Sequence, residues 1–361
     1  SRGEEEVRVN ELDEILRLAV KRHASDVHLQ AGLPPVLRIL TRLVPLEAAA
    51  LDAAATERLI FSIMSAEQQT WVRERREVDI SYDLPGVARF RINVFRQRDS
   101  VAAAFRLIPF DVPSPADLGL PSRVVELAKL KRGFVLLTGA AGQGKSTTIA
   151  ALIEIINHVQ PAHIITLEDP IEYIFPHEKG LVVQRELGRD TLSFAAGLRA
   201  ALREDPDVIL VGEMRDFETV EAALTAAETG HLVFATLHTK TAAQSIDRIV
   251  DVFPPHQQPQ VRAQLAHVLN AVVTQQLLVR RDGQGLCLAV ELMLVNPAIQ
   301  NLIREGKTYQ IQSVLQTSSA AGMITMESSL KALCDRGLIT YEDALGAAHD
   351  PRELARLMGR S

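Results

Sequence analysis

The apolar residues in the first third of the chain follow a helical period and then a strand period. Near the start they recur on one helical face, at Leu12, Ile15, Leu16 and Ala19. Strand-like segments follow at 26–30 and 36–40, then an alanine-rich helical stretch from 51 to about 76, and strands at 78–82, 87–95 and 101–108. Within 87–95 apolar residues alternate with Arg89, Arg91 and Asn93. We therefore expect an α+β domain over 1–108, ending in a hairpin that presents arginines.

Beyond this domain the pattern changes to short, fully apolar strands that alternate with helices. Four prolines fall within 109–121, a composition that breaks regular structure and predicts a linker. After it we expect strands at 134–138, 163–167, 208–211 and 231–237, and helices at 148–159, 194–203 and 218–229. Such strands are typical of a mainly parallel sheet covered on both faces. Residues 122–361 are thus predicted to form an α/β domain, mostly helical after Pro254 except for a strand pair at 277–280 and 286–294.

Composition excludes several classes of protein. Hydrophobic residues make up 47% of the 361 residues and the net charge is −6, so a nucleic-acid partner, which usually meets a basic face, is not expected. The two cysteines, Cys287 and Cys334, are far apart, which argues against a disulfide framework or a cysteine-rich zinc site. No apolar run approaches 18 residues, so we expect no direct membrane insertion and a cytoplasmic location.

A glycine-rich loop reading GAAGQGKST lies between the strand at 134–138 and the helix at 148–159. Its glycines allow successive backbone N–H groups to face one point, and the helix N-terminus adds partial positive charge. Lys145 can neutralise β/γ-phosphate oxygens, and Ser146 can ligate Mg²⁺. The loop therefore predicts a bound nucleoside triphosphate, held by Gly139, Gly142, Gln143, Gly144, Lys145, Ser146 and Thr147.

Two acidic clusters follow two of the predicted strands. The first is Glu168-Asp169-Pro170-Ile171-Glu172, and the second is Gly212-Glu213-Met214-Arg215-Asp216. Carboxylates at strand ends beside a triphosphate can hold Mg²⁺ through water or orient the attacking water, as hydrolysis requires. The alternative is that they only cap the following helices. Glu168 is our candidate general base, with Glu213 ordering Mg²⁺ or water, although spacing leaves open which glutamate takes the proton.

Histidines and arginines supply the remaining candidates. His231 and His238 flank the strand at 232–237 and can sense the γ-phosphate, or can be packed structural residues. Phosphoryl transfer also needs positive charge at the transition state, often from another domain or subunit. Arg91 and Arg106 are the candidates for this role, and a solvated basic face is the alternative.

Several of these segments together resemble the secretion and pilus ATPase superfamily, and within it the type IV pilus retraction ATPases, the PilT family. The resemblance covers nearly the whole chain, through ASDVHL (24–29), GVARFRINVF (86–95), GAAGQGKST (139–147), TLEDPIEY (166–173), LREDPDVILVGEMRD (202–216) and TAAETGHLVFATLHT (225–239). It implies a RecA-like core after a PAS-like domain, in a ring hexamer with nucleotide between the domains. It also implies a Walker A loop at 139–146, an aspartate box at 168–172, an atypical Walker B at 212–216, a histidine box at His231 and His238, and a pair, Arg91 and Arg106, that reaches the γ-phosphate.

Two features favour the retraction branch. The chain lacks the four-cysteine zinc insert of the assembly ATPases, and AIQNLIRE at 298–305 is similar to a retraction signature, with Gln300 where the family has arginine. The resemblance thus implies a Mg²⁺-dependent ATPase for pilus retraction and twitching motility. It would be peripheral at the inner membrane, bound to a platform protein, with a paralogous retraction ATPase as a further candidate partner. A nucleotide-binding accessory subunit and a pilus extension or type II secretion ATPase are the alternatives.

Overall fold

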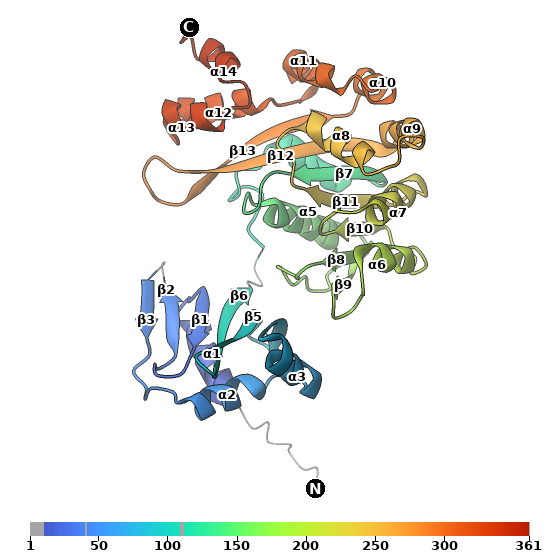
Figure 1. Ribbon diagram of the computed structural model, residues 1–361. Coiled ribbons are helices and arrows are strands. Elements are labelled where there is room, and N and C mark those ends of the chain that lie inside the picture. The colour runs from blue at the N-terminus through green and yellow to red at the C-terminus, as the bar shows by residue number, and fades with distance from the viewer. Residues whose placement is uncertain (1–10, 40–41, 109–111, 361) are drawn as a thin grey trace. The chain divides into compact units, whose positions relative to one another are not determined.

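A computed structural model describes residues 11–39, 42–108 and 112–360 of the chain. The chain divides into two compact units, Ser1–Asp111 and Val112–Ser361 (Figure 1). Each unit has its own buried hydrophobic residues, in one cluster in the first unit and in more than one in the second. Part of the expected linker, 109–111, lies outside the described residues, and the described part, 112–121, contains no helix or strand.

The first unit is an antiparallel sheet with helices. Its six strands have the order β3-β2-β1-β6-β5-β4 and are β1 Asp26–Leu29, β2 Val36–Ile39, β3 Arg42–Pro45, β4 Glu77–Leu84, β5 Ala88–Gln97 and β6 Ser100–Ile108. Its helices are α1 Glu11–Lys21, α2 Ala53–Phe61 and α3 Ala66–Arg75. The alanine-rich stretch forms two helices because Ser65 caps α3 with a capping box, which starts a new helix at Ala66 after α2 has ended at Phe61. The strand β3 was not predicted.

The hairpin of β5 and β6 forms as its alternating pattern predicts. Arg91 and Arg106 are register partners across the two strands, so both lie on one face of the sheet. Both residues are exposed, whereas Phe90, Ile92 and Phe105 on the other face are buried. The hairpin thus presents two arginines side by side.

The second unit contains the mainly parallel sheet, so the expected α/β class is confirmed. Its strand order is β13-β12-β7-β11-β10-β8-β9, and every neighbouring pair is parallel except β12 with β13. The strands are β7 Gly133–Thr138, β8 His163–Glu168, β9 Leu181–Glu186, β10 Val208–Val211, β11 Leu232–Leu237, β12 Leu269–Val279 and β13 Leu286–Leu294. Two hydrophobic clusters correspond to the two covered faces: one contains residues of α5 (Lys145–Val159), and the other contains residues of the helices from α6 (Phe194–Ala201) to α9 (Gln258–Val268).

The helices of the second unit fall into two groups along the chain. Those interleaved with or beside the parallel strands are α4 Ser122–Val125, α5 Lys145–Val159, α6 Phe194–Ala201, α7 Phe217–Glu228, α8 Ala242–Asp251 and α9 Gln258–Val268. The C-terminal helices are α10 Pro297–Glu305, α11 Ile311–Thr317, α12 Met326–Asp335, α13 Tyr341–Ala347 and α14 Pro351–Leu357. Residues of α12 to α14 form a separate cluster with Leu278 and Ala289 of the β12–β13 hairpin (Figure 1).

The sheet differs from the sequence prediction at two strands. The strand β9 was not predicted, and β12 is much longer than the expected 277–280. Residues 269–274 of β12 pair in parallel with β7, which places this strand directly beside the strand that leads into the glycine loop. Among the described helices, none is both long and apolar enough to span a bilayer.

Candidate nucleotide site

The glycine loop has the geometry that its sequence predicts. It connects β7 to α5, which begins at Lys145, and Gly144 before it has a left-handed φ of 77°. Gly139 has a φ of 139°, and a Cβ on it would lie 2.5 Å from the carbonyl oxygen of Gln275. Only glycine fits there, because a side chain would meet backbone that cannot move aside.

The neighbouring strand β12 holds this loop in place. The backbone N–H of Leu277 donates to the side-chain oxygen of Gln143 at 2.5 Å, and the Gln275 amide donates to Thr148 Oγ1 at 3.0 Å. Gln275 is buried. The loop is thus positioned by a strand that lies more than 100 residues further along the chain.

Lys145 is folded back onto the loop. Its ammonium donates to the carbonyl oxygens of Gly139 at 2.8 Å and Ala140 at 2.9 Å, and lies 3.4 Å from Nδ1 of His238. Burial lowers the pKa of Lys145, and the negative charges of Glu213 and Glu172 partly oppose this shift. A phosphate group would offer this partly desolvated cation better partners than two neutral carbonyls.

The carboxyl ends of three parallel strands meet the loop around a cavity of about 220 Å³. Glu168 ends β8, Gly212 and Glu213 follow β10, and His238 follows β11. The lining also includes Gly142, Lys145, Ser146, Asp169, Glu172, Tyr173, Phe194 and Thr236. This is the edge at which ligands bind in open α/β sheets.

Glu168 lies in an environment that favours its neutral form. Its Oε1 accepts hydrogen bonds from Thr166 Oγ1 at 2.6 Å and from the Gln184 amide at 3.2 Å. Burial nevertheless dominates and raises the pKa of Glu168 to about 7, while those two hydrogen bonds act in the opposite direction. A carboxyl group that titrates near neutrality is suited to accept and return a proton.

Glu213 lies in the opposite environment. Burial would raise its pKa, but a hydrogen bond from Arg215 and the nearby His238 outweigh burial, and the pKa of Glu213 is lowered. Its Oε1 lies 3.1 Å from Nε2 of His238. Because Nδ1 of the same ring faces Lys145, His238 connects the ionised Glu213 to the loop lysine.

The structure does not bring every candidate into this cavity. His231 lies at the start of β11, away from the strand ends, where its Nδ1 is 2.9 Å from the Ala226 carbonyl and 3.1 Å from Thr229 Oγ1. Arg91 and Arg106 belong to the other unit, where Arg106 Nε donates to Asp26 at 3.0 Å. The roles given to these three residues remain predictions.

Four side chains at the site were missed by sequence reasoning. Gln184 and Thr166 donate hydrogen bonds to Glu168. Gln275 supports the glycine loop through Thr148, and the Tyr173 hydroxyl lies 3.0 Å from Thr147 Oγ1. Gln275 carries a signal that could have found it, since a glutamine inside an apolar strand must satisfy its amide locally. The partners of Gln184 and Tyr173 lie 16 and 26 residues away in sequence, whereas Thr166 is only two residues before Glu168 on the same strand.

The oxygen donors at the cavity fit a hard cation. No cluster of three or more His, Cys, Asp or Glu side chains that could hold a metal occurs within 11–39, 42–108 and 112–360. Ser146 offers an exposed hydroxyl and Glu213 an ionised carboxylate to the same cavity. Mg²⁺ typically binds through one or two such groups together with substrate phosphates.

Known proteins resemble this chain over most of its length. Residues 2–314 match the family model for Type II/IV secretion system protein. The type IV pilus retraction ATPase PilT of Pseudomonas aeruginosa is 47% identical over 94% of this chain and 99% of its own length. The type IV pilus ATPase PilU of the same organism is 39% identical over 96% of this chain and 91% of its own.

A solved structure agrees with these relationships. The crystal structure of the pilus retraction motor PilT with bound ADP superposes with a TM-score of 0.89 at 52% identity, covering 95% of this chain and 98% of that one. The chain therefore belongs to the Type II/IV secretion system protein family, and within it to the PilT family of pilus retraction ATPases.

Proposed function

We propose that this protein is an ATP-hydrolysing motor that works as a ring hexamer and powers retraction of a type IV pilus, and hence twitching motility. The observation that carries the hydrolytic part is the cavity where Lys145 and Ser146 meet Glu168, Glu213 and His238 at the ends of parallel strands. The assignment to pilus retraction rests on the similarity to the PilT relatives.

The glycine loop binds the triphosphate. Gly139, Gly142, Gln143, Gly144 and Thr147 direct backbone N–H groups toward the phosphates, and the α5 N-terminus adds partial positive charge. Lys145 leaves the two loop carbonyls and contacts the β/γ-phosphate oxygens. Its attraction to the phosphates is strong because it is already partly removed from water.

Ser146 and Glu213 hold Mg²⁺, with Glu213 acting in part through water because both its oxygens already face Arg215 and His238. The metal supplies charge neutralisation on the phosphates when it is bound. Glu213 remains ionised throughout, as its lowered pKa requires. Because His238 contacts both Lys145 and Glu213, a movement of either side chain on phosphate binding also moves His238, which suits a γ-phosphate sensor.

Glu168 takes the proton of the attacking water. Its pKa near 7 leaves about half of the protein molecules with a free carboxylate at neutral pH. Thr166 and Gln184 orient this carboxylate from outside the cavity. Glu213 already contacts Arg215 and His238 and has a lowered pKa, so it is the weaker base.

The N-terminal domain, 1–108, supplies Arg91 and Arg106 to the γ-phosphate from across the domain boundary. Their pairing on one exposed sheet face supports this role, because two adjacent guanidinium groups can neutralise developing charge together. In this proposal the domain is PAS-like, 109–121 is the linker, and 122–361 is the RecA-like ATPase domain with its C-terminal helices. His231 senses a neighbouring subunit rather than the phosphate.

The motor acts in the cytoplasm, peripheral to the inner membrane, where a platform protein of the pilus machine receives its force. A paralogous retraction ATPase is a further proposed partner, because the chain is similar to both PilT and PilU. Nucleic acid is not a partner. Gln300, half-buried on α10, replaces an arginine of the retraction signature. Its uncharged side chain therefore makes a different contact from the one that the arginine makes in the family.

Turnover by the purified ring tests the hydrolytic proposal. The wild-type protein should hydrolyse ATP when Mg²⁺ is present, and Lys145→Ala should abolish nucleotide binding or turnover. Arg132→Ala, which changes an exposed cation just before β7, is the matched control and should leave both unchanged. Binding without any turnover in the wild-type protein would instead favour an accessory subunit.

A deletion strain tests the biological proposal. Loss of a retraction motor leaves excess surface pili, and a Lys145→Ala copy should fail to restore retraction. Loss of an extension or secretion ATPase would leave no pili, which would contradict the proposal. The missing cysteine insert speaks against that alternative.

A further inference from the structure

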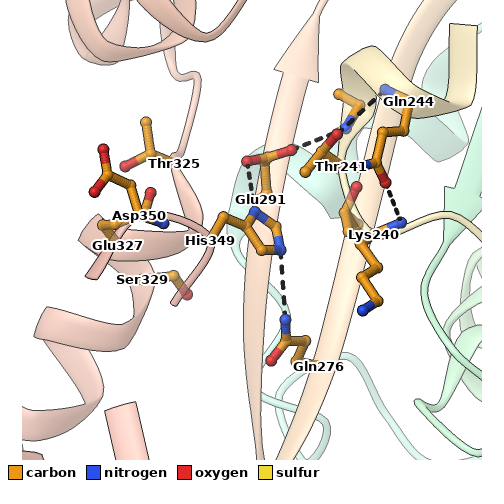
Figure 2. Close-up of polar contacts among 12 residues, drawn as sticks. Lys240, Thr241, Gln244, Gln276, Glu291, Thr325, Glu327, Ser329, His349 and Asp350 are labelled. Carbon is orange, nitrogen blue, oxygen red and sulfur yellow. Dashed lines mark hydrogen bonds and ion pairs between the residues drawn. The ribbon is translucent and has the colours of Figure 1, made fainter. Parts of the chain in front are cut away.

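A carboxylate is buried in the β12–β13 hairpin, away from the nucleotide cavity. The Glu291 side chain on β13 is only 1% exposed. Its Oε1 accepts a hydrogen bond at 3.0 Å from the backbone N–H of Ala242, the first residue of α8. Its Oε2 lies 3.5 Å from Nδ1 of His349 (Figure 2). Burying a charge in this way is costly unless its partners are kept in place.

His349 joins this carboxylate to the loop-supporting strand. It precedes α14 in the C-terminal helices, and its Nε2 lies 3.4 Å from the side-chain nitrogen of Gln276 on β12 (Figure 2). When the Gln276 amide donates to Nε2, the neutral ring carries its hydrogen on Nδ1, which faces Glu291. The imidazole therefore bridges β13 and β12.

The groups on both sides of this bridge, Gln276 on β12 and Ala242 on α8, lie next to residues of the nucleotide site. Gln276 stands between Gln275, whose carbonyl packs on Gly139, and Leu277, whose N–H binds Gln143. Ala242 follows His238 by four residues. His349 also lines a cavity together with Gly139 and Gln143.

We propose that Glu291 and His349 form a positioning pair that couples the C-terminal helices to the ATP site. The pair holds β12 beneath the glycine loop and holds the start of α8 behind His238. Neither residue lines the nucleotide cavity, so both act through the groups that they position. This inference rests on the proposed function, and it adds a route by which load on the C-terminal helices changes the rate of hydrolysis.

The chain contains a matched control for this pair. Glu327 on α12 is also fully buried, and its Oε1 accepts from the backbone N–H of Asp350 at 2.8 Å (Figure 2). Truncation of either glutamate removes a buried carboxylate that binds one backbone N–H. Only Glu291 contacts α8 and, through the His349 side chain, β12, whereas Glu327 holds the backbone of Asp350, the residue after His349.

Hydrogen exchange on the full-length ring tests the coupling without requiring turnover. In Glu291→Ala and His349→Ala, amides of 139–148 and 238–242 should exchange about tenfold faster, since local opening there loses a support. His349→Asn keeps a donor near the Nδ1 position but loses the Nε2 contact with Gln276, so slow exchange should return at 238–242 and not at 139–148. Glu327→Ala keeps both side chains of the pair, so it should accelerate exchange mainly within α12 to α14 and less at 139–148 than His349→Ala does, because it frees only the backbone beside His349. Equal acceleration at 139–148 in Glu327→Ala, or none in His349→Ala, would overturn the inference.

Kinetics provide the second readout. Glu291→Ala and His349→Ala should each lower kcat about tenfold, and the KM for ATP should change less than about twofold, because small misplacement affects the transition state most. The double variant should be no slower than either single one, since both remove one unit. If the losses in kcat multiplied in the double variant, or if Glu327→Ala lowered kcat to a similar extent, the proposed pair would be contradicted. If Glu291→Ala does not fold, the partly exposed His349 variants decide the question. An inactive wild-type ring would defeat the proposed function alone, because the exchange measurement stands independently.

Discussion

The acidic groups at the ends of β8 and β10 share one cavity but have opposite protonation behaviour. Thr166 and Gln184 donate hydrogen bonds to Glu168, but burial dominates and raises its pKa to about 7. Burial also acts on Glu213, but Arg215 and His238 outweigh it and lower its pKa. Two carboxyl groups whose surroundings separate their pKa values are suited to different roles, and we propose that Glu168 is the base and Glu213 a fixed negative charge.

Removal of each carboxylate should separate these roles most clearly. Glu168→Gln keeps the acceptor for Thr166 but cannot take a proton, so turnover should fall by at least about 100-fold while nucleotide binding remains. Glu213→Gln should turn over ATP much more slowly than the wild-type protein, and its residual activity should require more Mg²⁺ for half-maximal rate. The measurements are steady-state ATPase rates across a Mg²⁺ series and nucleotide binding. If instead Glu168→Gln turned over normally, Glu168 would be removed from the mechanism.

The pH dependence should follow Glu168 and not Glu213. A base works only when ionised, so kcat/KM should rise about tenfold per pH unit below a midpoint near 7 and then level off. The folded-state pKa of Glu168 is raised, so its ionisation opposes folding, and this penalty grows as pH rises from its ordinary value of 4.5 through about 7.

Thermal unfolding checks the same assignment. Glu168→Gln should unfold at a higher temperature than the wild-type protein at pH 8 and at nearly the same temperature at pH 5. If the midpoint of the kcat/KM profile against pH stays near 7 in Glu213→Gln, the titrating group is Glu168. A midpoint that disappears in that variant would assign the titration to Glu213.

The smallest effect should come from Thr166→Val. The Thr166 hydroxyl lowers the pKa of Glu168, so its removal should move the midpoint of the pH profile upward by about half a pH unit, as expected for one hydrogen bond. Thr274→Val removes a buried hydroxyl contact with Thr138 elsewhere in the sheet and is the control. An unchanged midpoint in Thr166→Val, or an equal shift in Thr274→Val, would contradict this account of Glu168.

The sequence by itself determined the elements and most of the chemistry of this protein. Period-two alternation predicted the β5–β6 hairpin, and apolar strands alternating with helices predicted the mainly parallel sheet, because side-chain periodicity is local. The glycine loop was readable because Gly139 and Gly144 have conformations that other residues avoid. Strand ends in a parallel sheet meet at one edge, so Glu168, Glu213 and His238 could be placed together.

Only the tertiary structure decided how these groups differ. Most of β12 was missed because its parallel partner β7 lies more than 100 residues earlier in the chain. The strands β3 and β9 were also missed, although they pair with the preceding strands β2 and β8, and β3 is mostly exposed and so lacks an apolar alternation. The separate pKa values of Glu168 and Glu213 depend on burial and on neighbours that no spacing reveals. His231 and His238 are seven residues apart in one motif, yet only His238 reaches the cavity, because a strand carries its two ends to opposite edges of the sheet.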